Sequence, residues 1–217
     1  MKPEVEDQIC FIVEKTTKKA AIEEWKKSSE QQRVPLYNYR FDHVKEVVEL
    51  AKHIGPTTDA NMEVVTLAAW FHDVAKPGLE GVAIKDHGVA SAEIAEHWMI
   101  DKGYDQDMIS RVSDTIRKHV GLKLEKPLEP IEAQVLWESD KILKLGIVGL
   151  LQHVLNGVRY NPGQELKDIA ERLHDFLPLA QGIASSVATQ CGKKIANERM
   201  QSLHTLSKML DSELNHK

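Results

Sequence analysis

Apolar residues recur at three- and four-residue intervals along nearly the whole chain, and this periodicity constrains the fold more than any other feature. Within residues 39–54, for example, Val44, Val47, Val48 and Ala51 form one stripe. Only 20 of the 217 residues are Gly or Pro, so the chain has few turns and long elements are favoured. We find no convincing strand pattern, internal repeat or flexible linker. The sequence therefore predicts an all-α fold.

The ends of the predicted helices are set by Gly, Pro and capping residues. The third helix should begin after Thr58 or Asp59 and end near residues 74–76, because Pro77 disfavours helical backbone before it. Its residues 64–71 are almost continuously apolar, so this helix has to be central. The other helices are expected at about residues 3–30, 39–54, 87–102, 105–120, 130–145, 147–158, 163–177 and 181–214. We expect a single domain over residues 1–217, with its core at about 39–145 and a C-terminal helical extension at about 146–217.

Charge and composition exclude several classes of protein. The chain has 28 Lys and Arg against 33 Asp and Glu, a net charge of −5, which disfavours stable nucleic-acid binding. Its longest apolar run, Leu145 to Leu151, is far shorter than the roughly 20 residues of a membrane span. The acidic start MKPEVEDQ does not resemble a signal peptide, and Cys10 and Cys191 form no CxxC motif. We expect a cytoplasmic protein that does not bind membranes.

The ten histidines are the one unusual number in the composition. There is no GxGxxG, GxxxxGK, HExxH or GxSxG motif, so the histidines and aspartates remain the candidates for chemistry. His72-Asp73 follows the most apolar helix, so it should be buried, and a buried charge needs a partner or a metal. His174-Asp175 lies in an ordinary amphipathic stretch, where a solvated position is the better prediction.

Four further residues extend this pattern on separate predicted helices: His43, His87, His119 and Asp140. The order His…His-Asp…His…His…Asp resembles the HD-domain superfamily of metal-dependent phosphohydrolases, over about residues 39–145. The resemblance implies an HD-like helical bundle with additional N- and C-terminal helices. It implies that His43, His72, Asp73 and Asp140 ligate a first metal ion. In the binuclear branch of the superfamily, His87 and His119 would bind a second ion, with Asp73 bridging the two.

The chemistry of these residue types agrees with the resemblance. Imidazoles and carboxylates together suit Mn, Fe, Co, Ni or Zn, with Mg left open, and we expect one ion with a second as an open alternative. A bound ion acidifies water into a nucleophile and polarises a phosphoryl oxygen. Asp73 would take part in catalysis, and Lys76 and Arg40, one helical turn from His72 and His43, are candidates to neutralise a substrate phosphate. Weaker candidates for phosphate binding are Arg117, Lys118 and Lys123.

The sequence thus predicts a metal-dependent phosphohydrolase acting on a nucleotide or another small phosphate ester or anhydride. Two alternatives stay open: an HD-like diiron oxygenase with the same order of ligands, and a non-catalytic metal-binding scaffold of the same fold. His97 is the one rival to His87 as a ligand of the second ion. A homodimer is also left open.

Overall fold

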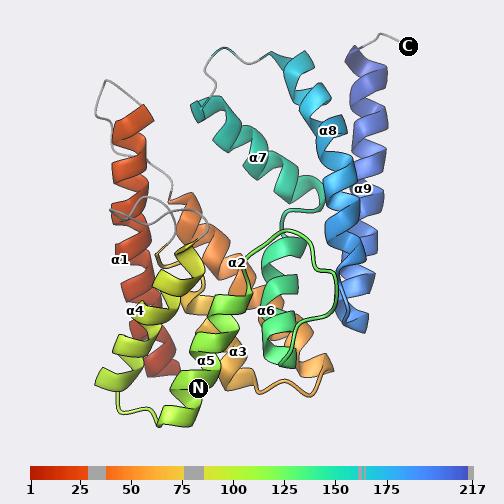
Figure 1. Cartoon of the computed structure of the whole chain (residues 1–217). Helices are drawn as coiled ribbons and strands as arrows, with labels where there is room; N and C mark the ends of the chain where they lie inside the picture. The colour runs from red at the N-terminus through yellow and green to blue at the C-terminus, as the bar shows by residue number, and fades with distance from the viewer. Residues whose placement is uncertain (29–37, 76–85, 161–162, 164, 215–217) are drawn as a thin grey trace. The chain divides into compact units, whose positions relative to one another are not determined.

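The computed structural model describes residues 1–28, 38–75, 86–160, 163 and 165–214. Within these ranges the chain forms nine α-helices and a short 3-10 helix, η1, with no β-strand, which confirms the all-α prediction (Figure 1). The bounds of the elements are α1 Pro3–Ser28, α2 Tyr39–Ile54, η1 Gly55–Thr57, α3 Met62–Phe71, α4 His87–Asp101, α5 Gln106–Lys118, α6 Ile131–Ile142, α7 Gly146–Tyr160, α8 Leu166–Ser185 and α9 Gln190–Leu214.

Helix α3 begins and ends differently from its prediction. Its N-cap is Asn61, whose side chain accepts hydrogen bonds from the backbone N–H groups of Glu63 and Val64, so the expectation of a Thr58 or Asp59 cap was wrong. The backbone of Asn61 is itself held in place, since its N–H donates to Glu132 at 2.9 Å. Regular helix stops at Phe71, and residues 72–75 form a turn.

The predicted break before residue 181 was also wrong, because α8 continues through Pro178 to Ser185. A proline inside a helix removes one backbone hydrogen bond and costs roughly 3 kcal/mol. Here Leu173, Ala180 and Ile183, on both sides of the proline, are all buried. Continuous burial of one helix face offsets the cost, since tertiary packing overrides local propensity.

The chain divides into two compact units, and the boundary between them falls within α6. The N-terminal unit comprises Met1–Val120 and Leu128–Ser139, and the C-terminal unit comprises Gly121–Pro127 and Asp140–Lys217. The expectation of a single domain, with an extension after residue 145, stays a prediction.

Helix α3 is the centre of the N-terminal unit, as its apolar sequence predicts. It packs against α1, α2, α4 and α5, and residues 64–71 are all buried. Complete burial at this position lets the residues that follow α3 enter a site shielded from water. In the C-terminal unit, α7 and α8 each pack against α9. None of the helices in the described ranges is both long enough and apolar enough to span a bilayer.

Candidate metal centre

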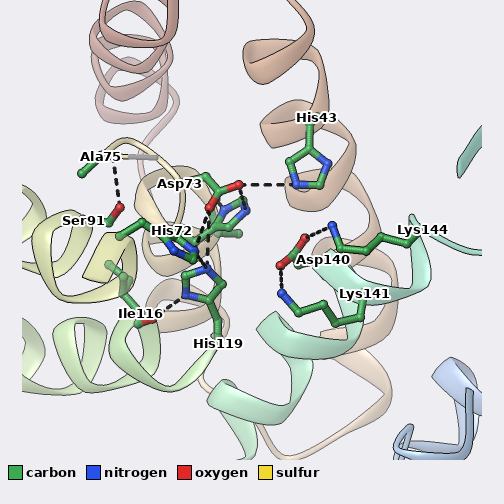
Figure 2. Close-up of polar contacts among 12 residues, drawn as sticks. His43, His72, Asp73, Ala75, Ser91, Ile116, His119, Asp140, Lys141 and Lys144 are labelled. Atoms are coloured by element: carbon green, nitrogen blue, oxygen red, sulfur yellow. Dashed lines mark hydrogen bonds and ion pairs between the residues drawn. The ribbon is translucent and has the colours of Figure 1, made fainter. Parts of the chain in front are cut away.

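Helix ends of the N-terminal unit bring four predicted site residues together. His72 is the C-cap of α3 and is followed by Asp73 in the turn, His87 is the first residue of α4, and His119 is the C-cap of α5. His43 joins them from the second turn of α2 (Figure 2). His72 and His119 have no exposed surface, and Asp73 is 3% exposed. These five residues are called the Asp73 cluster below.

The carboxylate of Asp73 lies at the centre of four imidazoles. Its Oδ2 atom is 3.7 Å from Nε2 of His43 and 3.5 Å from Nε2 of His72. Its Oδ1 atom is 3.4 Å from Nε2 of His87 and 3.6 Å from Nε2 of His119. Each carboxylate oxygen therefore faces a different pair of histidines, and each pair with Asp73 forms a group that can hold a metal ion.

These distances fit shared coordination better than hydrogen bonding. An N–H···O hydrogen bond spans about 2.7–3.2 Å, shorter than all four contacts. Two ligand atoms that each lie about 2.1 Å from one ion are separated by roughly 3.0–3.4 Å. The His87 contact of 3.4 Å falls in this range, and the other three, at 3.5–3.7 Å, lie just above it. The donor set is nitrogen and oxygen without sulfur, which suits divalent transition metals. The two sides of the Asp73 carboxylate therefore each carry a candidate ligand group for a metal ion.

Backbone carbonyls orient two of the imidazoles. Nδ1 of His72 is 2.7 Å from the carbonyl oxygen of Ala69, and Nδ1 of His119 is 2.6 Å from that of Ile116 (Figure 2 draws the second contact). A carbonyl oxygen only accepts, so Nδ1 carries the proton in each ring. The lone pair is then on Nε2, the atom that faces Asp73, which is the arrangement metal-ligating histidines adopt in proteins.

Close packing of α4 on α5 brings His87 to His119. A Cβ atom on Gly88 would lie 2.6 Å from a methyl carbon of Val120, so only glycine allows this approach. Arg117 of α5 also pairs with Glu96 of α4 at 2.5 Å. Burial alone would raise the pKa of the Glu96 carboxyl, but hydrogen bonds from Arg117 and Ser113 lower it below its ordinary range.

A serine fixes the turn that carries Asp73. The hydroxyl of Ser91, on α4, accepts a hydrogen bond of 3.1 Å from the backbone N–H of Ala75 (Figure 2). Both residues are buried, Ser91 completely. Because Ala75 lies two residues after Asp73, this bond restrains the backbone of the turn. The sequence reasoning missed Ser91, since nothing in its local sequence indicates a partner 16 residues away.

Asp140 lies at the end of α6 and belongs to the C-terminal unit. It is 2% exposed, and its carboxylate contacts Nζ of Lys141 and, at 3.6 Å, Nζ of Lys144 (Figure 2). Burial beside two cations agrees with a functional carboxylate, while its coordination of an ion held by Asp73 stays a prediction. Neither lysine was among the predicted site residues, although Lys144, four residues after Asp140 in the helix predicted at about 130–145, carries the usual signal for an ion pair.

The predicted phosphate-binding residues have different outcomes. Arg40 lies on α2, 6% exposed, with its guanidinium 5.4 Å from the centroid of the Tyr39 ring. Lys76 lies outside the described residues. Arg117 is occupied by Glu96, and Lys118 by the side chain of Asp114 and the carbonyl of Glu129. Both are therefore explained by the packing of their helices.

The remaining histidine predictions concern residues outside the cluster. His97 is exposed, and its Nδ1 bonds the carbonyl of Glu93 one turn earlier. Among the described residues, two groups are able to hold a metal; one of them contains His87, and neither contains His97. His174 and Asp175 are both exposed, as expected for a solvated pair, and His174 contacts Asp211 at 2.9 Å.

One curated relative shares sequence with this chain. It is a tRNA (cytidine(56)-2′-O)-methyltransferase of Thermoplasma volcanium, 30% identical over 161 residues. The match covers 67% of this chain but only 44% of the methyltransferase, so the chain spans less than half of that protein's length.

Solved structures share the fold at low sequence identity. An HD-superfamily hydrolase of Bacillus thuringiensis matches with a TM-score of 0.64 at 16% identity, covering 94% of this chain and 97% of its own. Bacillus subtilis YpgQ, in complex with ADP, matches with a TM-score of 0.62 at 18% identity over 80% of this chain and 88% of its own. A predicted HD-superfamily hydrolase from an uncultured Thermotogales bacterium matches with a TM-score of 0.62 at 18% identity, covering 96% of this chain and 92% of its own. The HD domain family model matches residues 40–180, well over half of the sequence, and this chain therefore belongs to the HD domain family.

Proposed function

We propose that this chain is a metal-dependent phosphohydrolase that acts on a nucleotide or another small phosphate ester or anhydride. The observation that carries the proposal is the Asp73 carboxylate, buried between two pairs of imidazole Nε2 atoms. The HD domain implies divalent metal binding, and the YpgQ structure that shares this fold contains ADP. Methyl transfer to tRNA is not proposed, because the match covers less than half of that methyltransferase.

Each residue of the site has a proposed role. His43, His72, Asp73 and Asp140 hold the first ion, and His87 and His119 hold a second, with Asp73 shared between them. A bound divalent ion lowers the pKa of water to near neutral and neutralises charge on a phosphoryl group. The chain's own part is to keep the Nε2 lone pairs directed inward through the Ala69 and Ile116 carbonyls and to exclude bulk water.

Arg40 and Lys76 are proposed to bind the substrate phosphate. The Arg40 guanidinium is three residues from His43 on the same helix, so both can reach one ligand. A planar guanidinium binds two phosphate oxygens at once, whereas a lysine acts as a point charge.

The test combines metal analysis with a substrate screen. Purified protein should contain at least one divalent transition metal ion per chain. A phosphatase screen with a nucleotide panel should find a substrate whose hydrolysis stops in excess chelator and returns with Mn, Co or Ni. Full hydrolysis in chelator, with no metal detected, would contradict the proposal. Oxygen consumption with the spectrum of a mixed-valent diiron centre would instead identify an oxygenase.

A further inference from the structure

A cavity of about 210 Å³ lies within the C-terminal unit, between α7 and α8. The two helices pack against α9, and Figure 1 shows α7 and α8 diverging from each other toward one end. Helices α7 and α8 each contribute one leucine and one aromatic ring to the lining. Two cations also line it, one on α8 and one just before α7. The lining residues that matter here are Lys144, Leu150, His153, Arg172, Leu173 and Phe176.

Two rings give the cavity a surface for a planar group. The His153 and Phe176 rings are nearly parallel, 12° apart in plane, with their centroids separated by 6.5 Å. That separation is near the outer limit for two aromatic rings in contact, about 7 Å, so their mutual stacking is weak. Leu150 and Leu173 supply apolar surface beside them. Planar heterocycles such as nucleobases stack on aromatic side chains of this kind.

Two cations line the same cavity. Arg172 lies four residues before Phe176 on α8, so the guanidinium and the ring share one face of that helix. Lys144 contributes a second positive charge from the other side, and its Nζ also contacts Asp140. Among the described residues that line the cavity, none is acidic. Arginine and lysine together favour an anion, and the arginine fork favours phosphate.

The size of the cavity limits the ligand. At about 210 Å³ it is below the roughly 300 Å³ at which pockets begin to enclose a drug-sized molecule. It therefore does not enclose a whole nucleotide, and a ligand with one phosphate suits it better than one with an extended polyphosphate. We propose that the C-terminal unit binds a nucleoside monophosphate here, with its base against His153 and Phe176 and its phosphate on Arg172 and Lys144. Such binding needs neither metal nor hydrolysis, so it goes beyond the proposed function.

Calorimetric titration of the whole chain in excess chelator tests this site. Adenosine monophosphate, cytidine monophosphate and inorganic phosphate are the probes. At least one nucleotide should bind saturably and more tightly than inorganic phosphate. Arg172→Gln should weaken nucleotide binding at least about tenfold, because it removes the phosphate fork. Phe176→Leu should weaken nucleotide binding at least about fivefold and leave phosphate binding unchanged, because it removes only the stacking surface.

Two matched variants control for charge and ring loss elsewhere. Lys167→Gln removes an exposed cation from α8, and Phe11→Leu removes an exposed ring from α1, so both should bind nucleotide as the wild type does. His119→Ala should also retain binding, because His119 belongs to the Asp73 cluster and not to this cavity. If His119→Ala fails to bind nucleotide while Arg172→Gln binds it as the wild type does, the proposal is overturned. The absence of saturable binding to the wild type at millimolar nucleotide would overturn it as well. Should Arg172→Gln not fold, the imidazole NMR signals of wild-type His153 decide: they must shift with the nucleotide and not with phosphate.

Discussion

The Nε2 atoms of His87 and His119 lie 3.2 Å apart although the two residues are 32 positions apart in the sequence. Both also face Oδ1 of Asp73. The backbone carbonyl of Ile116 accepts a hydrogen bond from Nδ1 of His119, so the proton is on Nδ1 and the lone pair of the ring is on Nε2. Two imidazole nitrogens and one carboxylate oxygen, all within 3.6 Å of one another, form a candidate set of ligands for one ion.

The double variant His87→Ala/His119→Ala tests the second ion. We expect it to lose about half of the bound metal and most of its turnover, while remaining folded, because His43 and His72 still face Oδ2 of Asp73. Metal stoichiometry by elemental analysis and turnover on the identified substrate are the measurements. His97→Ala is the control, since that ring is exposed and bonded only within its own helix turn among the contacts described. Wild-type stoichiometry and rate in the double variant would show a mononuclear site.

The two His-Asp pairs of the sequence provide an internal comparison. Asp73→Ala should lower bound metal and reduce turnover by orders of magnitude, since this carboxylate lies among all four imidazoles. It should also abolish the rise in melting temperature that added metal gives the wild type, because a ligand that binds only the native state stabilises it. Asp175→Ala removes an exposed charge and should change the free energy of unfolding by no more than about 0.5 kcal/mol.

Asp140→Ala tests whether the buried carboxylate of α6 shares the ion. We expect its metal content and turnover to fall as in Asp73→Ala, because in the proposal only a common ion links the two residues. Turnover of the variant, measured while Mn is titrated in, distinguishes a site with lowered metal affinity from one that no longer binds metal. A harmless Asp140→Ala variant would remove this residue from the proposed ligand set and leave the Asp73 cluster as it stands.

Ser91→Ala tests the hydrogen bond that restrains the Asp73 turn. The substitution leaves the buried N–H of Ala75 without its acceptor, which should cost about 1–2 kcal/mol of unfolding free energy. Metal affinity should fall about tenfold, as when other groups that position metal ligands are removed. Ser185→Ala is the matched control, because Ser185 is exposed and bonds a carbonyl of its own helix. A loss of stability without loss of metal affinity would make Ser91 purely structural.

The ion pair between Glu6 of α1 and Lys52 of α2 predicts a pH dependence of stability. Burial alone would raise the pKa of Glu6, but hydrogen bonds from Lys52 and Trp70 lower it below its ordinary range. A carboxyl with a lowered pKa in the folded state stabilises the fold above its ordinary pKa, and that contribution is lost as the pH falls through the lowered value. Burial would lower the pKa of Lys52, but its bond to Glu6 raises it, so its contribution is lost only at high pH.

Denaturant unfolding of Glu6→Gln as a function of pH checks this. The variant should be less stable by up to about 1 kcal/mol near neutrality, a small value because both side chains are partly exposed. Its stability should also decline less steeply than that of the wild type on the acidic side. Parallel curves for the two proteins would show that Glu6 does not contribute through its charge.

The sequence alone determined the elements whose signals are local. The bounds of α2 follow from its apolar stripe and from Gly55-Pro56, and the burial of His72-Asp73 follows from the apolar helix that precedes it. These predictions succeed because helical periodicity and punctuation by Gly and Pro act over a few residues. The order of the histidines and aspartates also indicated the family, which the match over residues 40–180 confirmed.

The tertiary structure decided what depends on contacts between distant residues. Asn61 became the cap of α3 where its backbone meets Glu132, and α8 passed through Pro178 because one face stays buried on both sides of it. The convergence of His87 and His119 on Asp73 required the close approach of α4 to α5 at Gly88. No local pattern encodes such distances, since the separation of two side chains on different helices is set by how the helices pack.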